Sequence, residues 1–249
     1  MVRIEICADG VRSAENAQSA GVECIELCSS LENGGLTPSV GTLSKAMETL
    51  FIPTRVLIRP RSGNYTYDKD ETDIMITDIM LAKQLGYEGV VIGALDENEM
   101  PDKQTLSILM QAGEGLKFTF HRAIDACPRP AEAVEQLIEL GFDKVLTSGG
   151  KPSAIEGYKL IGELQQTFGE HIRIMAGGGI NADNVLTLLN QTGISDIHAS
   201  LSRPVKKYNS DLYPKGKDNT GAQMVWNETS MTELARLVKV IDEYNLITN

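Results

Sequence analysis

The segment RIEICADGVRSAENAQSAGVECIELC, residues 3–28, contains two short runs that alternate apolar and polar side chains. The runs are RIEIC (3–7) and CIELC (24–28), and an alternation of period two is typical of a β-strand. Between them, SAENAQSAG is rich in alanine and ends in glycine, which indicates a short helix. The segment therefore predicts one strand–helix–strand unit.

Six more runs of the same kind follow, each separated from the next by a helical pattern. They are RVLIR (55–59), GVVIG (89–93), KFTFH (117–121), KVLTS (144–148), IRIMA (172–176) and DIHAS (196–200). Eight such units in a chain of 249 residues are typical of a closed parallel (β/α)8 barrel, the TIM barrel. An open doubly wound sheet is the alternative, but no unit carries the GxGxxG turn of a dinucleotide-binding fold. We therefore predict a single TIM-barrel domain over residues 1–249, with its core at about 3–200.

Several residues mark the expected ends of helices. Pro130 in the first turn and Gly141 after the last turn bound one predicted helix. Asn181 is the predicted N-cap of another.

The chain continues past the eighth strand over residues 201–249. Its first part is polar, and residues 203–224 are expected to form a loop. Ser230 and Glu233 then form a capping box ahead of a C-terminal helix with one apolar face. We expect this helix to close the barrel.

The composition restricts the cellular setting and the partners. A formal net charge of -11 and a pI near 4.8 argue against nucleic acid or an anionic membrane, because both favour a basic surface. No apolar run reaches the roughly 18–20 residues of a membrane span, and MVRIEICADGV lacks the basic head and long apolar middle of a secretory signal. Four cysteines in so long a chain do not make a disulfide framework. We expect a cytoplasmic protein with free thiols.

The period of two also indicates which side chains point into the predicted barrel. In the first two runs Glu5, Cys7, Glu26 and Cys28 share the inward face, and the matching Glu-x-Cys motifs are expected at the same height on neighbouring strands. Toward the carboxyl ends of other strands, the same alternation predicts more inward-pointing side chains. They are Arg59, Arg61, Thr119, His121, His198 and Ser200. Barrel enzymes build their sites at this rim.

Two interpretations of these inward residues stay open. Their charges either neutralise one another as a structural network or line a polar pocket. In a pocket, Glu26, His121 and His198 are the candidate catalytic residues for general acid and base chemistry. No activated-nucleophile motif such as GxSxG accompanies them.

A glycine-rich segment, MAGGGINADN (175–184), follows the seventh predicted strand and precedes a helix. Such a backbone can aim free N–H groups at an anion, and barrels often bind phosphate near their seventh and eighth units. A tight turn without a ligand is the alternative. The candidate anion-binding residues are Arg59, Arg61, Gly177, Gly178, Gly179 and Ser200.

Two pairs of cysteines could form a disulfide or bind a shared metal ion, and their expected geometries differ. Cys24 and Cys28 lie four positions apart on one strand, so their α-carbons are about 13 Å apart, too far for a disulfide or a shared metal ion. Cys7 and Cys28 would lie on strands about 4.8 Å apart and face the same way, so two thiolates there could clamp a soft ion such as Cu(I). The alternative is that both thiols are small buried hydrophobes.

Seven motifs in order, between about residues 3 and 200, are IELCSSLENGGLTPS, VLIRPRSGNYTYDKDE, GVVIGAL, FTFHRAIDACPRP, KVLTSGG, IMAGGGI and IHAS. Together they strongly resemble the CutC family, named as copper homeostasis proteins. The resemblance implies a (β/α)8 barrel, a cytoplasmic homo-oligomer (dimer or tetramer) and a proposed Cu(I) site whose ligands fall on Cys7 and Cys28. The chain departs from relatives at YTYD (65–68), at Cys24 and after Ser200, which leaves the loop contacts open.

Two functions of different classes follow. The first is Cu(I) binding or trafficking for copper homeostasis, with Cys7 and Cys28 as metal ligands and no other cofactor. The second is a TIM-barrel enzyme that acts on a small anionic substrate, for example a phosphorylated one. It is considered because the polar residues at the rim exceed what a two-sulfur metal site requires.

Overall fold

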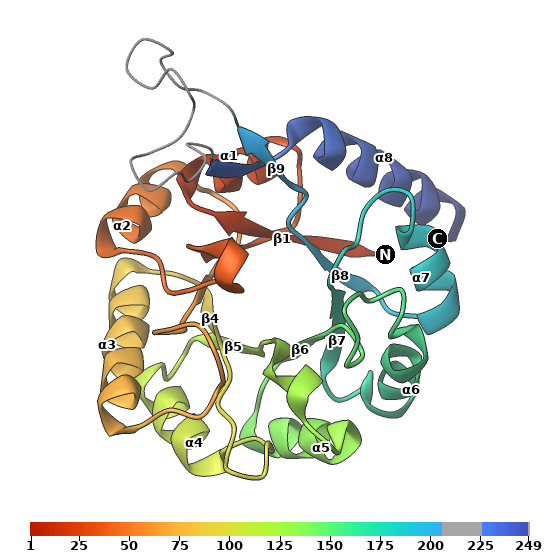
Figure 1. The fold of residues 1–249 in the computed structure, drawn as a ribbon. Coiled ribbons are helices and arrows are strands. Elements are labelled where there is room, and N and C mark those ends of the chain that lie inside the picture. Colours follow the sequence, from red (N-terminus) through yellow and green to blue (C-terminus); the bar gives the residue numbers. More distant parts are fainter. Residues whose placement is uncertain (206–225, 249) are drawn as a thin grey trace, which may run out of the picture.

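The computed structural model describes residues 1–205 and 226–248, and its centre is a closed barrel of eight parallel strands (Figure 1). The strands pair in sequence order, and β8 pairs with β1 to close the ring. They are β1 (Arg3–Asp9), β2 (Cys24–Cys28), β3 (Thr54–Leu57), β4 (Gly89–Ile92), β5 (Lys117–Phe120), β6 (Lys144–Thr147), β7 (Arg173–Gly177) and β8 (Asp196–Ala199). The prediction of a TIM barrel is confirmed.

Helices form the outer ring of the barrel and alternate with the strands (Figure 1). They are α1 (Val11–Ser19), α2 (Val40–Thr49), α3 (Lys69–Leu85), α4 (Lys103–Ala112), α5 (Pro130–Leu140), α6 (Tyr158–Phe168), α7 (Val185–Thr192) and α8 (Met231–Thr248). Two short 3-10 helices, η1 (Leu31–Asn33) and η2 (Arg122–Ala126), follow β2 and β5. No helix among these described residues is long and apolar enough to cross a bilayer.

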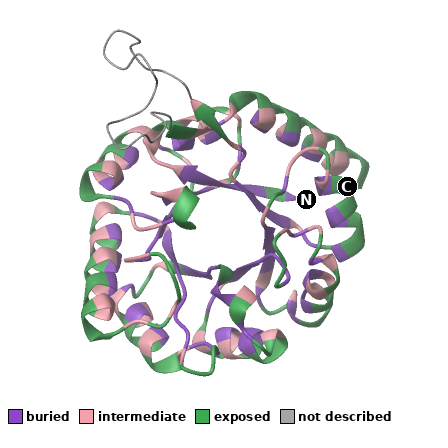
Figure 2. Ribbon diagram, viewed as in Figure 1, coloured by how far each residue is buried: buried purple, intermediate pink, exposed green. Residues whose placement is uncertain are grey.

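The apolar core lies between the strands and the helices. Ile4 and Ile6 on β1 and Ile25 and Leu27 on β2 point outward and are buried under the helices. Figure 2 shows the strands of the barrel as largely buried and the outer faces of the helices as exposed. Because side chains alternate along a strand, this outward apolar set leaves the intervening polar residues to face the barrel interior.

Neighbouring strands are offset in register, which corrects one expectation. Cys7 lies opposite Glu26 and Glu5 opposite Cys24, so the two Glu-x-Cys motifs are displaced by two residues and not level. The stagger follows from the tilt of strands in a closed barrel, which one strand's own sequence does not specify.

Both predicted ends of α5 are confirmed, whereas the predicted start of α7 is wrong. α5 begins at Pro130 and ends before Gly141, whose left-handed φ of 90° is the usual glycine C-cap. α7 begins at Val185 and not directly after Asn181. The Asn181 side chain instead accepts a hydrogen bond from the Asp183 N–H, at 2.9 Å, and holds a turn before the helix.

The chain after β8 forms a two-stranded ribbon that contacts β1 and α1. β9 (Ser202–Val205) and β10 (Trp226–Thr229) pair antiparallel beside α1 (Figure 1). Residues 203–205 of the predicted loop are therefore strand, and the rest of that loop lies outside the described residues.

The last helix, α8, packs between α7 and α1 and completes the ring. Ser230 caps it by accepting a hydrogen bond from the Glu233 N–H at 3.5 Å, which is half of the predicted capping box. The Glu233 carboxylate pairs with Arg236 and Arg203.

Candidate functional site

A cavity of about 380 Å³ opens at the carboxyl ends of the strands. Its floor is formed by side chains from β1, β2, β3, β6 and β8, and its wall by the loops after β2, β3, β5, β7 and β8. Most sequence-predicted site residues line it: Cys7, Glu26, Arg59, His121, Gly178, Gly179, His198 and Ser200. The alternation of the strands brings Cys7, Glu26 and His198 to one place, and the loops that follow the strands add the other residues.

A buried ion pair lies in the barrel beneath this floor. The Lys144 ammonium donates to Glu5 Oε2 at 2.7 Å, and both side chains are 3% exposed. The second oxygen of Glu5 is 3.0 Å from His198 Nδ1. Burial alone would raise the pKa of Glu5, but the charges and hydrogen bonds of Lys144 and His198 outweigh it and hold that pKa well below its usual range.

This arrangement fixes the His198 ring. Because Nδ1 is bonded to Glu5, Nε2 is the ring nitrogen left for a ligand on the cavity side. Burial opposes a charged ring, but the nearby carboxylates of Glu26 and Glu5 raise the pKa of His198 above its ordinary value.

Glu26 contacts Cys7 and keeps one oxygen free. The Cys7 thiol donates to Glu26 Oε1 at 3.3 Å, whereas Oε2 has no hydrogen-bond partner within the described part of the chain. The residue is only 4% exposed. Burial raises the pKa of Glu26, and the charge of Glu5 adds to the effect. A buried oxygen without a partner at the edge of a cavity is suited to a ligand that enters the cavity.

The thiols of Cys7 and Cys28 lie 3.6 Å apart, within the reach predicted from the sequence. Both are buried, and they pack with Leu57, Val91 and Leu31 in a cluster separate from the main core. The hydrogen bond with Cys28, together with burial, raises the pKa of the Cys7 thiol well above its ordinary value. Without a metal ion, the Cys7 thiol is therefore protonated at neutral pH.

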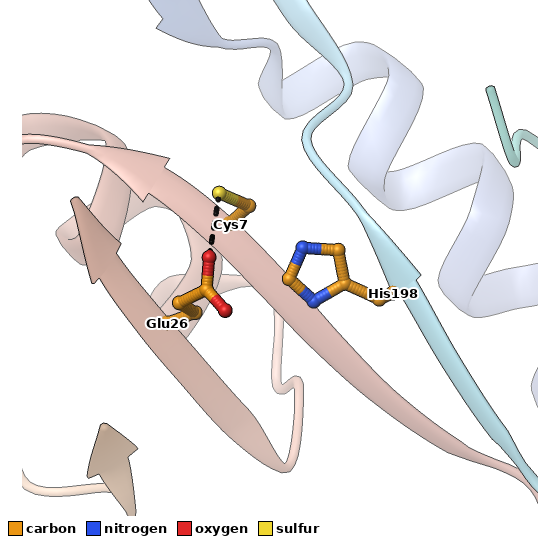
Figure 3. A group of neighbouring side chains, drawn as sticks. All are labelled: Cys7, Glu26 and His198. Atoms are coloured by element: carbon orange, nitrogen blue, oxygen red, sulfur yellow. Dashed lines mark hydrogen bonds between the residues drawn. The ribbon is translucent and has the colours of Figure 1, made fainter. Parts of the chain in front are cut away.

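Three side chains converge in this region from adjacent strands (Figure 3). Cys7 on β1, Glu26 on β2 and His198 on β8 each offer one ligand atom, and these atoms all lie within 4.8 Å of one another. Sulfur, carboxylate oxygen and imidazole nitrogen together are a donor set for a borderline or soft metal ion. From the sequence, Glu26 and His198 were predicted to be catalytic residues, and only Cys7 and Cys28 to be metal ligands.

His121 lies on another side of the cavity as a neutral ring. Its Nδ1 accepts a hydrogen bond from the Ala123 N–H at 3.1 Å, and its Nε2 is buried without a partner in the described structure. The ring packs on Tyr65, with centroids 4.9 Å apart. Burial, and then the charge of Arg59, lower the pKa of His121 to about 3.

The two arginines that were predicted to bind an anion, Arg59 and Arg61, bond to other residues of the protein. The Arg59 guanidinium donates to the carbonyls of Asn33, Gly35 and Gly63 at 3.0–3.1 Å and so ties the loop after β2 to the loop after β3. Arg61 pairs with Glu71 and does not line the cavity. Arg59 therefore shapes the wall of the cavity through backbone contacts.

The glycine loop after β7 forms part of the wall. Gly178 and Gly179 have φ values of 110° and 72°, which only glycine adopts without strain, whereas Gly177 belongs to β7 and does not line the cavity. The Gly178 carbonyl accepts from the Ala154 N–H and the Gly179 carbonyl from the Asn184 side chain. These bonds fix the two carbonyls, and the Asn181 N–H of the same loop donates to Asn184 Oδ1 at 2.9 Å.

Sequence reasoning missed Lys144, Tyr65 and Arg122. Lys144 is inward by the same alternation that identified Glu5, so the pattern contained the signal. Tyr65 and Arg122 line the cavity from the loop after β3 and from η2. No periodicity indicates where loop residues point, and their role depends on how the loops fold.

The fold and the cavity define a parallel (β/α)8-barrel protein with a polar, thiol-containing site at the carboxyl ends of its strands. The model of the CutC family matches residues 2–203. The chain belongs to the CutC family.

Individual relatives agree with this assignment. A family protein CutC from Pasteurella multocida is 47% identical over 80% of this chain and 82% of its own. Another from Xanthomonas axonopodis pv. citri is 40% identical over 96% of this chain and 97% of its own. The crystal structure of a CutC protein from Streptococcus agalactiae, assigned provisionally to copper homeostasis, is 34% identical, with a TM-score of 0.77 over 80% of this chain and 99% of that one.

Proposed function

We propose that this protein binds Cu(I) in the cytoplasm through Cys7 and Cys28 and thereby serves copper homeostasis. The observation that carries the proposal is the 3.6 Å separation of the two sulfurs. Metal–sulfur bonds of about 2.3 Å span at most about 4.6 Å between two sulfurs, so one ion fits between these thiols after small side-chain adjustments. Thiolates are the ligands that a soft ion such as Cu(I) prefers.

The surroundings of the pair support exchange of the ion. Cys7 lines the cavity and Cys28 is fully buried behind it, so Cu(I) would enter and leave past Cys7. Leu57, Val91 and Leu31 pack around the two sulfurs and make part of their surroundings apolar. Both thiols lose a proton on binding, so affinity is expected to rise with pH.

The test is competition for Cu(I) between the protein and a chromophoric chelator under anaerobic conditions. The parent is expected to take one equivalent of Cu(I). The double change Cys7→Ser, Cys28→Ser is expected to weaken binding by more than about a hundredfold, since even changes outside the ligand set of a metal site cost about 10–100-fold.

The matched control is the double change Cys24→Ser, Cys127→Ser. It removes the same number of thiols from positions outside the Cys7–Cys28 cluster and should leave affinity unchanged. Equal Cu(I) affinity in the parent and the Cys7, Cys28 double variant would refute the proposal.

A second candidate function rests on the cavity, which is far larger than one ion requires. As an enzyme for a small anionic substrate, the protein would hold the anion at Gly178, Gly179 and Ser200 and exchange protons at Glu26, His121 and His198. Arg203, an exposed cation at the cavity wall, would attract the negative charge of such a substrate.

Thermal shift with inorganic phosphate, phosphosugars and small carboxylates tests this candidate. A ligand at 100 times its dissociation constant stabilises the folded state by about 2.7 kcal/mol, and Arg203→Met should reduce the shift. No shift with any of these anions would remove the enzymatic candidate and leave the Cu(I) proposal untouched.

A further inference from the structure

We propose that Cys7, Glu26 and His198 form a second metal site, selective for a borderline divalent cation such as Zn²⁺, with one coordination position open to the cavity. The site shares Cys7 with the proposed Cu(I) pair but uses a different ligand set and a different class of metal. It goes beyond the proposed function and does not depend on it.

The distances fit a tetrahedral ion. Cys7 Sγ and Glu26 Oε1 are 3.3 Å apart, and the three ligand atoms lie within 4.8 Å of one another (Figure 3). Zinc–sulfur and zinc–oxygen bonds of about 2.3 and 2.0 Å at a tetrahedral angle place the two atoms roughly 3.5 Å apart. The thiol proton that now joins Cys7 to Glu26 occupies the place where the metal would lie between them.

Charge and burial fit a divalent cation as well. The Cys7 thiolate and the Glu26 carboxylate supply two negative charges, and a neutral His198 adds none, so Zn²⁺ yields a neutral buried site. The residues are 4%, 4% and 8% exposed, respectively. Glu26 Oε2, which has no partner among the residues described, would gain one from a bound metal or from a metal-bound ligand.

A surrounding shell already orients the imidazole ligand. Glu5 holds His198 Nδ1 at 3.0 Å and is itself held by Lys144 at 2.7 Å. Carboxylate–histidine pairs of this kind fix the ring nitrogen that binds zinc. Because the carboxylate of Glu5 is neutralised by Lys144, it orients the ring without adding net charge to the site.

The open position distinguishes this site from a structural one. Cys7, Glu26 and His198 all line the cavity, so three protein ligands leave the fourth position toward it. Three protein ligands plus an exchangeable one are typical of zinc sites that act on or bind small molecules. The ligand class expected there is a small anion or a neutral oxygen donor that fits the cavity.

The test uses Co²⁺, a spectroscopic substitute for Zn²⁺, titrated anaerobically into the metal-free full-length protein. We expect one equivalent to produce ligand-field bands of tetrahedral intensity and a near-ultraviolet thiolate charge-transfer band, both removed by Zn²⁺. Azide should shift the ligand-field bands by occupying the open position. A six-coordinate spectrum without the charge-transfer band would overturn the site, and insensitivity to azide would overturn the open position.

Variants separate this proposal from the Cu(I) proposal. Glu26→Gln and His198→Asn should weaken Co²⁺ and Zn²⁺ at least about tenfold and keep Cu(I), whereas Cys28→Ser should keep the Co²⁺ spectrum and lose Cu(I). Cys127→Ser is the control and should keep both. Glu26→Gln preserves side-chain shape, and circular dichroism checks the fold of each variant. Parent-like Zn²⁺ affinity in Glu26→Gln and His198→Asn, or loss of Co²⁺ in Cys28→Ser, would overturn the proposal.

Discussion

The substitution Glu5→Gln is expected to lower the free energy of unfolding by about 3–5 kcal/mol, because it leaves the Lys144 ammonium buried in the barrel without a counter-charge. The two side chains are each 3% exposed, so bulk water compensates little for the lost partner. Urea denaturation followed by circular dichroism measures the change.

Two further variants show whether the loss comes from the pair. Adding Lys144→Met to Glu5→Gln should recover part of the stability, since the unpaired charge is then gone. Glu139→Gln breaks the exposed pair with Lys103 and should cost little. A loss in Glu5→Gln no larger than that in Glu139→Gln would show that Lys144 does not depend on Glu5.

Acid destabilisation is expected to depend strongly on His121. The pKa of the folded protein's His121 is about 3, against 6.5 for a free imidazole, because the ring is buried near Arg59. Between these values the unfolded chain binds a proton that the folded protein does not, so stability is full above about pH 6.5 and falls with pH toward 3. Each pH unit in this window costs at most about 1.4 kcal/mol, and at pH 4.5 the loss from this group is about 2.7 kcal/mol.

His121→Asn should remove this contribution. Asparagine stays neutral and can still accept the hydrogen bond from the Ala123 N–H that His121 Nδ1 accepts. The variant's stability, measured by denaturation from pH 7 to pH 4.5, should therefore fall less steeply than the parent's. His171→Asn changes an exposed histidine far from the cavity and should follow the parent curve. Parallel curves for the parent and His121→Asn would contradict this explanation.

The alternation of side chains along single strands explains why so much of the site could be predicted. Whether Glu5, Cys7, Glu26 or His198 faces inward depends only on the two-residue period and on which face carries the apolar residues. The count of strand–helix units then closes the barrel and brings these strands together. Inward orientation and a common end of the barrel therefore follow from local sequence.

The features that could not be predicted depend on relations between segments. The two-residue offset that sets Cys7 opposite Glu26 is a property of the whole barrel, because strand number and tilt together fix the stagger. Arg59 was predicted to bind an anion, and its bonds to backbone carbonyls could not be predicted because they come from loops whose course the sequence does not specify. Cys7 lies within reach of Cys28 and also of Glu26 and His198. This double proximity depends on how three strands lie side by side, so the sequence of one strand does not show it.

X-ray absorption at the copper edge of protein loaded with one equivalent of Cu(I) tests the central claim most directly, because it identifies the atoms bonded to the metal. We expect sulfur to be the principal neighbour of Cu(I) in the parent, and that sulfur signal to be lost in the Cys7→Ser, Cys28→Ser variant. A first shell of nitrogen and oxygen alone, or an unchanged sulfur shell in the double variant, would contradict it.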